Sequence, residues 1–220
     1  MIKNGMSRNF HKTWLAVFAL VAVGLPVWTR VGSLGWQSRP DIIPNLFPVF
    51  GLLAFSLLWL HALSGVFEPW LRRQINFDKF VDSTSLVILI SIILHPLLAW
   101  ANVNFSFKDL FAYGEARAIW LGIFGLLLLL TYDVGKFLKK YKFFSRNWTN
   151  ILTISTVGFL LTFFHSLSLG SDLQSGFLRK VWIFYGVTAI FATIYTYGYK
   201  RRLKGSGNQA DHHYADKIEN

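Results

Sequence analysis

Six long apolar segments constrain the fold of this chain more than any other feature of its sequence. They fall at 13–32, 46–67, 83–101, 118–135, 148–169 and 178–199. Each is about 18–22 residues long, the length that an α-helix needs to cross the hydrocarbon layer of a bilayer. Because a backbone in lipid must satisfy its own hydrogen bonds, these segments predict an all-α, integral membrane bundle of six transmembrane helices.

The composition places the chain in the membrane class. Hydrophobic residues make up 53% of the 220 residues and charged residues only 15%, whereas a soluble domain has about a quarter charged residues. The net charge of +11 would suggest nucleic-acid binding in a soluble protein, but membrane topology explains it here, so we expect no nucleic-acid partner. The absence of cysteine excludes disulfides, thiolate metal sites, Cys-held iron–sulfur clusters and covalent c-type haem attachment.

Basic residues alternate in number between the two sets of loops that six helices create. One set, with both ends of the chain, carries most of the 22 Lys and Arg residues: Lys3, Arg8, Lys12, Arg72, Arg73, Lys79, Lys136, Lys139, Lys140, Lys142, Arg146, Lys200, Arg201, Arg202, Lys204 and Lys217. The other set carries Arg30, Arg39, Lys108, Arg117, Arg179 and Lys180. Because Lys and Arg collect on the cytoplasmic side of membrane proteins, we expect both termini in the cytoplasm.

The chain divides into one membrane domain and one tail. We assign residues 1–204 to the six-helix transmembrane domain, and residues 205–220 to a disordered cytoplasmic tail because they are polar and charged. The tail contains His212 and His213, which we interpret as part of a solvated segment rather than a metal site. The first apolar segment is long for a signal peptide and lacks a small-residue cleavage site, so we interpret it as a retained helix.

Three histidines, His61, His95 and His165, lie inside the apolar segments. A single intramembrane histidine is often a hydrogen-bonding group between helices, but two of these lie at similar depth. His95 is roughly 20 Å along its helix from Asp82, and His165 is roughly 25 Å along its helix from Trp148. Two neutral imidazoles at matched depth on different helices can hold one haem iron from both faces. That arrangement leaves no open iron position for substrate, so it suits electron transfer.

Small and polar residues accompany this histidine pair. Ser91 lies one turn before His95 and is a candidate hydrogen-bond partner for its imidazole N–H. Gly158 lies two turns before His165 on the same face, where it either makes room for a flat macrocycle or forms an ordinary small-residue contact between helices. The sequence leaves both roles open for Gly158.

His61 does not join the pair. The second segment runs inward from Leu46, which places His61 near the cytoplasmic face. It is a candidate ligand for a second, inner haem, but no other intramembrane histidine lies at that depth. We therefore favour a hydrogen-bonding role or a place in a quinone site.

Six helices with histidines in the third and fifth resemble the ferric reductase-like transmembrane domain family. This family includes the membrane cores of ferric reductases and NADPH oxidases, and the haem-binding membrane subunit of bacterial periplasmic methionine-sulfoxide reductase. The stretch from Leu71-Arg72-Arg73 to Leu94-His95 resembles the arginine-then-Leu-His pattern of the bacterial members, and Trp148 with His165 resembles the family's fifth helix. The resemblance covers most of residues 46–199. It implies a b-type cytochrome in a bacterial inner membrane, acting as an electron-transfer subunit of an oxidoreductase system.

The chain departs from this family at the inner haem. The family usually has a second histidine in the fifth helix, where this sequence has Leu152, and its oxidases have another in the third helix, where this sequence has Val81. The resemblance therefore implies one haem b, held by His95 and His165, unless His61 contributes to an unusual inner site.

The resemblance also implies partners. After Tyr199 we expect no flavin or nicotinamide domain, so the electron donor is a quinol or a separate reductase, and the acceptor, which can be a soluble protein, acts on the outer side of the membrane. Arg117, in an outer loop, either pairs with the haem propionates or is a plain loop charge.

The main alternative is a haem-free membrane protein, either an assembly subunit or a small transporter, in which the histidines only make hydrogen bonds within the bundle. An intramembrane aspartic protease is excluded, because the topology places Asp133 and Asp172 at opposite faces, separated by most of the ~30 Å hydrocarbon layer, where they cannot share a proton. The sequence contains no HExxH or GxSxG motif, so zinc-protease and rhomboid-like functions lack support.

Overall fold

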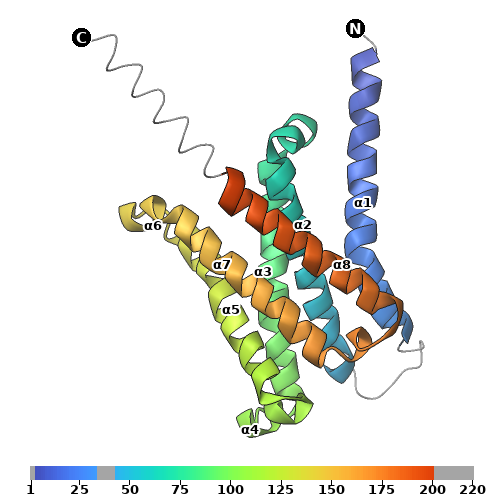
Figure 1. Ribbon diagram of the computed structural model, residues 1–220, viewed down its shortest axis with the longest axis vertical. Coiled ribbons are helices and arrows are strands. Elements are labelled where there is room, and N and C mark those ends of the chain that lie inside the picture. Colours follow the sequence, from blue (N-terminus) through green and yellow to red (C-terminus); the bar gives the residue numbers. More distant parts are fainter. Residues whose placement is uncertain (1–2, 34–42, 201–220) are drawn as a thin grey trace.

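The computed structural model describes residues 3–33 and 43–200, which form a helical bundle (Figure 1). Six helices are long and apolar enough to cross a membrane: Phe10–Ser33, Leu46–Gln74, Phe77–Asn102, Ala116–Phe137, Trp148–Leu169 and Gly176–Tyr199. The all-α fold and the six spanning segments predicted from the sequence are therefore confirmed. The predicted tail, with His212 and His213, lies outside the described residues.

Short helical elements connect the spanning helices. In chain order the elements are α1 (Lys3–Ser33), α2 (Ile43–Gln74), α3 (Phe77–Asn102), α4 (Phe107–Leu110), η1 (Phe111–Tyr113), α5 (Ala116–Phe137), α6 (Lys142–Arg146), α7 (Trp148–Leu169), η2 (Ser171–Leu173), α8 (Gly176–Thr193) and η3 (Ile194–Tyr199). The last element, η3, continues α8 as a π-helical segment.

Helix α2 extends further than the apolar pattern predicts, because it ends at Gln74 and not at residue 67. The charged side chains of its last turns are paired. Arg72 lies one turn after Glu68, and its Nε is 3.0 Å from Glu68 Oε1. The same guanidinium binds Asp78 Oδ1 at 2.9 Å, at the start of α3. Charged residues lower the average hydropathy, so the predicted segment ends before them. Their pairing nevertheless contributes to the stability of the final turns.

Two antiparallel helix pairs, α2 with α3 and α5 with α7, form the body of the bundle (Figure 1). Helix α8 packs against α2 and α7, and α1 packs against α2 at the edge. Between α2 and α8, the Trp59 ring stacks on Tyr185 at a centroid distance of 4.0 Å, and Trp59 Nε1 donates to Thr188 Oγ1 at 2.8 Å. Such packing and hydrogen bonds hold helices together where lipid supplies little hydrophobic driving force.

One end of the bundle collects basic residues, and we call it the basic end. Helices α2 and α5 stop there and α3 and α7 begin there. Besides the Arg72–Asp78 pair between α2 and α3, two further ion pairs occur at this end among the described residues, Lys136 with Asp82 at 2.7 Å and Lys200 with Glu68 at 3.9 Å. Its other basic residues are Lys12, Arg72, Arg73, Lys79, Lys139, Lys140, Lys142 and Arg146. The far end of the bundle is called the opposite end.

Candidate functional site

The structure brings His95 of α3 and His165 of α7 together inside the bundle. Their ring centroids are 6.3 Å apart and their planes are 86° apart. We call these two residues the histidine pair. Because α3 ends at Asn102 and α7 ends at Leu169, both histidines lie late in their helices. The histidine pair therefore lies nearer the opposite end than the basic end.

Each ring of the histidine pair is oriented by a backbone carbonyl of the neighbouring helix. His95 Nδ1 lies 2.7 Å from the carbonyl oxygen of Phe47 on α2, and His165 Nδ1 lies 2.8 Å from that of Ala118 on α5. A carbonyl oxygen only accepts hydrogen bonds, so we assign the proton to Nδ1 in both rings. In the neutral imidazole, Nε2 then keeps a free lone pair, which is the form that ligates a metal.

A glycine lies against each ring, one helical turn after the carbonyl that binds it. A Cβ added at Gly51 would lie 2.9 Å from His95 Nδ1, and a Cβ at Gly122 would lie 2.5 Å from His165 Nδ1. Gly51 follows Phe47 by four residues and Gly122 follows Ala118 by four. The α2–α3 pair and the α5–α7 pair therefore hold their histidines in the same way, with a carbonyl at one position and a glycine four residues later.

The histidine pair lines an apolar cavity of about 280 Å³, which we call the histidine cavity. Helices α2, α3, α5 and α7 supply most of its walls, and Trp182 of α8 adds to them. Its few polar side chains include Tyr113, Ser166 and Asp172, which belong to the part near the opposite end. An apolar hollow with a small number of polar groups is the usual form of a small-molecule or cofactor site.

The other residues predicted for this site lie elsewhere. Ser91 is buried at 1% exposure, but the partner of His95 Nδ1 is the Phe47 carbonyl, and Ser91 does not line the histidine cavity. Arg117 is exposed and does not line this cavity either. The sequence did not predict the Phe47 and Ala118 carbonyls as partners. Every residue has a backbone carbonyl, so no residue type marks the ones that bind histidine.

Gly158 serves helix packing. A Cβ there would lie 2.7 Å from the backbone nitrogen of Leu129 and 2.8 Å from the carbonyl oxygen of Gly125, both on α5. Only a residue without a side chain allows α5 and α7 to approach this closely. Of the two roles that the sequence left open, the geometry supports the contact between helices.

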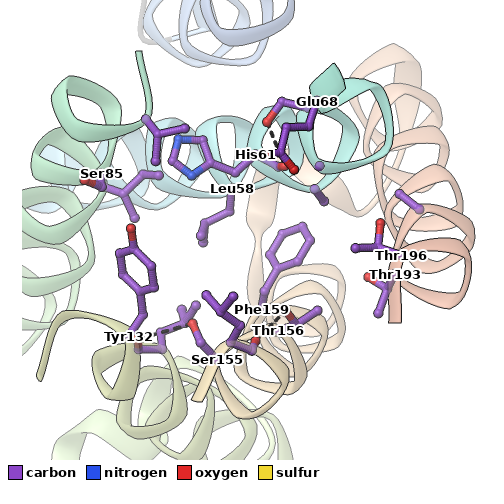
Figure 2. A pocket seen from close by; sticks show the side chains of 18 of the residues that line it. Leu58, His61, Glu68, Ser85, Tyr132, Ser155, Thr156, Phe159, Thr193 and Thr196 are labelled. Carbon is purple, nitrogen blue, oxygen red and sulfur yellow. Dashed lines mark hydrogen bonds between the residues drawn. The ribbon is translucent and has the colours of Figure 1, made fainter. Parts of the chain in front are cut away.

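His61 of α2 lies apart from the histidine pair, in the wall of a larger cavity of about 620 Å³ (Figure 2). We call this the basic-end cavity, because its lining includes Glu68, Arg72 and Lys139 of the basic end. His61 Nε2 is 2.6 Å from Thr84 Oγ1 of α3. A hydrogen-bonding role for His61 is thus present in the structure.

The two aspartates considered for a protease lie at opposite ends. Asp133 lines the basic-end cavity, whereas Asp172 Oδ1 binds Arg30 Nη1 at 3.0 Å near the opposite end. The placement agrees with the exclusion of a catalytic dyad.

Comparisons of the chain with protein-family models, with curated proteins and with solved structures find no match. The functional assignment therefore depends on the chemistry of the histidine pair and its surroundings.

Proposed function

We propose that His95 and His165 are the two axial ligands of one b-type haem, and that the protein carries electrons across the membrane to an acceptor on its outer side. The observation that carries this proposal is a pair of neighbouring imidazoles, with ring centroids 6.3 Å apart, whose Nδ1 atoms are both bound to carbonyls.

The spacing of the histidine pair suits a shared iron. A bond from a metal to an imidazole nitrogen is about 2 Å, and the ring centre lies about 1 Å further from the metal. Two imidazoles in line on opposite sides of one metal therefore have centres about 6 Å apart, and the observed distance is 6.3 Å. The angle of 86° between the ring planes is compatible with this, since each plane can contain the axis through the metal.

The donor set favours a porphyrin over a bare metal ion. In the described part of the chain, no three His, Asp, Glu or Cys side chains gather into a metal-binding group. Two imidazoles alone leave a bare transition metal short of ligands, whereas a porphyrin supplies four nitrogens of its own. The histidine cavity is lined mainly by apolar side chains, which suits the apolar faces of a porphyrin ring. When bound, the haem would supply a one-electron carrier without an open coordination position.

The distribution of charge supports an orientation for this transfer. Lys and Arg favour the cytoplasmic side, so we place the basic end in the cytoplasm, with both termini on that side. The histidine pair, nearer the opposite end, then lies in the outer half of a bacterial inner membrane. The donor is a quinol or a separate reductase. Methionine-sulfoxide reductase, ferric ion and oxygen are all compatible acceptors, since the fold alone does not choose among them.

The alternative function, a haem-free assembly subunit or transporter, is also supported by one observation. The Nδ1 bonds to Phe47 and Ala118 already give each histidine a role within the bundle. This alternative gives no role to the two Nε2 atoms, for which the structure shows no hydrogen-bond partner among residues 3–33 and 43–200.

The visible spectrum of the purified protein decides between the two functions. We expect a b-type reduced spectrum with one haem per chain from cells supplied with haem precursors. His95→Ala and His165→Ala should each abolish it, whereas His61→Ala should keep it, because His61 lies in the other cavity. A folded but colourless protein from the same cells would support the haem-free alternative.

A further inference from the structure

One corner of the basic end concentrates positive charge. Residues 136–147 lead from the end of α5 through α6 to the start of α7, and we call them the α6 corner. Figure 1 shows α6 at the edge of the bundle. The chain has no Asp or Glu from residue 134 to residue 171, so no acidic residue of its own neutralises this corner. Five exposed basic residues lie in it: Lys136, Lys139, Lys140, Lys142 and Arg146.

The connection between α2 and α3, at the same end, has a different balance of charge. Residues 68–82 contain three basic and three acidic residues, and Arg72 there binds two carboxylates. In the α6 corner, Lys136 is the one basic residue that forms an ion pair within the described part of the chain, with Asp82 of α3. Membrane orientation accounts for a basic end as a whole. It does not account for the concentration of unneutralised charge in one corner.

Two lysines of the α6 corner lie against aromatic rings. Lys139 Nζ lies 4.4 Å from the centre of the Trp148 ring, and Lys140 Nζ lies 5.3 Å from that of Tyr141. The attraction of a ring for an ammonium group is electrostatic, so the N–H donors of each lysine stay available to a ligand. Lysine and arginine bind phosphate oxygens through charge-assisted hydrogen bonds, which are stronger than neutral ones.

Large aromatic side chains alternate with these cations. Phe137, Tyr141 and Phe143 are 78%, 54% and 69% exposed. A group of exposed apolar side chains marks a surface that interacts with a protein or a membrane. At a membrane–water interface, aromatic rings lie at the level of the headgroups. A surface that presents both cations and aromatic rings therefore suits a charged headgroup with acyl chains beside it.

The position of the α6 corner favours a lipid over a soluble protein. Phe124, Leu127, Val134 and Phe137 are exposed apolar residues of α5, and their spacing places them on one side of the helix. Because α5 is long and apolar enough to cross a membrane, we expect this side to contact acyl chains. The stripe ends at Phe137, inside the α6 corner. A lipid whose chains lie along the stripe therefore has its headgroup at the level of the corner's cations.

We propose that the α6 corner binds the headgroups of anionic phospholipids in the leaflet at the basic end. The phosphate of a lipid such as phosphatidylglycerol accepts hydrogen bonds from Lys140, Lys142 and Arg146, and its chains lie along the exposed stripe of α5. A zwitterionic lipid suits the surface less, because these cations repel its ammonium group. The inference depends on neither haem nor electron transfer, so it holds or fails independently of the proposed function.

Binding is tested on the full chain in a non-ionic detergent, with phosphatidylglycerol as the probe and native mass spectrometry to measure its Kd. The wild type should bind phosphatidylglycerol about 10-fold more tightly than phosphatidylcholine. The triple variant Lys140→Gln, Lys142→Gln and Arg146→Gln should bind it about 10–100-fold more weakly, since each basic residue near a membrane surface contributes about fivefold. These side chains are exposed, so the Tm of this variant without added lipid should equal that of the wild type.

The matched control removes three other exposed charges from the basic end, with Lys12→Gln, Arg73→Gln and Lys79→Gln. It should keep the wild-type Kd for phosphatidylglycerol, although the net charge falls by the same amount. Equal losses of affinity in the two triple variants would overturn the inference, because the whole basic end would then attract the lipid. Wild-type affinity in the α6-corner variant would also overturn it and would leave this surface to a soluble partner. Inorganic phosphate at the same concentration should not displace the lipid, and full displacement would show a site for free phosphate instead.

Discussion

Gly122 is the position at which one added methyl group most directly tests the histidine pair. A Cβ at residue 122 would lie 2.5 Å from His165 Nδ1 and 2.6 Å from His165 Cε1. Nonbonded heavy atoms rest at about 3.5 Å or more, so the His165 ring must retreat by about 1 Å in Gly122→Ala. That movement weakens its bond to the Ala118 carbonyl and displaces Nε2 from the position in which we expect it to ligate iron.

The stability change in Gly122→Ala combines opposing effects. Alanine is favoured over glycine in a helix interior by about 0.5–1 kcal/mol. Overpacking costs about 1–3 kcal/mol, and a lost hydrogen bond costs about 1 kcal/mol more. We therefore expect a net destabilisation of about 1–3 kcal/mol. Loss of the group that orients a ligating histidine typically lowers metal affinity by about 10–100-fold, and we expect haem affinity to fall by that factor.

Two other glycines provide graded controls. A Cβ at Gly51 would lie 2.9 Å from His95 Nδ1, so Gly51→Ala should have the same effect to a smaller degree. A Cβ at Gly24 has no atom within 4 Å, so Gly24→Ala should keep full haem affinity. The assays are the haem-to-protein ratio, the rate of haem transfer to excess apomyoglobin, and helicity by circular dichroism. Equal haem retention in Gly122→Ala and Gly24→Ala, with equal helicity, would refute the reasoning.

Three further predictions concern the surroundings of the site. Gly158→Ala should lower thermal stability by about 1–3 kcal/mol, because its Cβ meets the backbone of α5; unchanged melting would contradict the close contact. Asp172→Ala should lower stability more than Asp78→Ala in the same melting assay. The Arg30–Asp172 side chains are only 12% and 19% exposed, whereas exposed pairs such as that of Asp78 contribute about 0.2–1 kcal/mol. Arg117→Ala should leave haem content unchanged in the pyridine haemochromogen assay, since Arg117 is exposed and does not line the histidine cavity. A lower haem content in this variant would instead support pairing of Arg117 with the haem propionates.

Counting residues along two helices predicted that His95 and His165 lie at similar depth, but it did not predict their hydrogen-bond partners. Counting at 1.5 Å per residue places His95 and His165 at similar levels, because rise along a helix is a local property. The carbonyls of Phe47 and Ala118 could not be predicted in this way. They come from neighbouring helices, and which of the many carbonyls faces a ring depends on the rotation and crossing of the helices. For the same reason the sequence suggested Ser91, which shares a helix with His95, and not a carbonyl of a neighbouring helix.

Glycine patterns illustrate the same limit. Gly51, Gly122 and Gly158 look alike in sequence, each as a glycine with apolar residues on both sides. In the structure the first two lie against imidazole rings and the third against backbone. A repeated spacing was available as a signal, since a glycine follows both Phe47 and Ala118 by four residues. This spacing can be interpreted only when it is known that the His95 and His165 rings lie against these positions.

The sequence by itself determined six helices long and apolar enough to cross a membrane, because hydrophobic length and backbone hydrogen bonding in lipid are set by local sequence. It also determined the alternation of basic loops, from which the orientation is proposed. Only the tertiary structure decided that two imidazoles far apart in sequence lie side by side, that the Phe47 and Ala118 carbonyls orient them, and that His61 lines a separate cavity beside theirs. Those relations depend on how helices rotate and pack against one another, and hydropathy along a single chain does not encode that geometry.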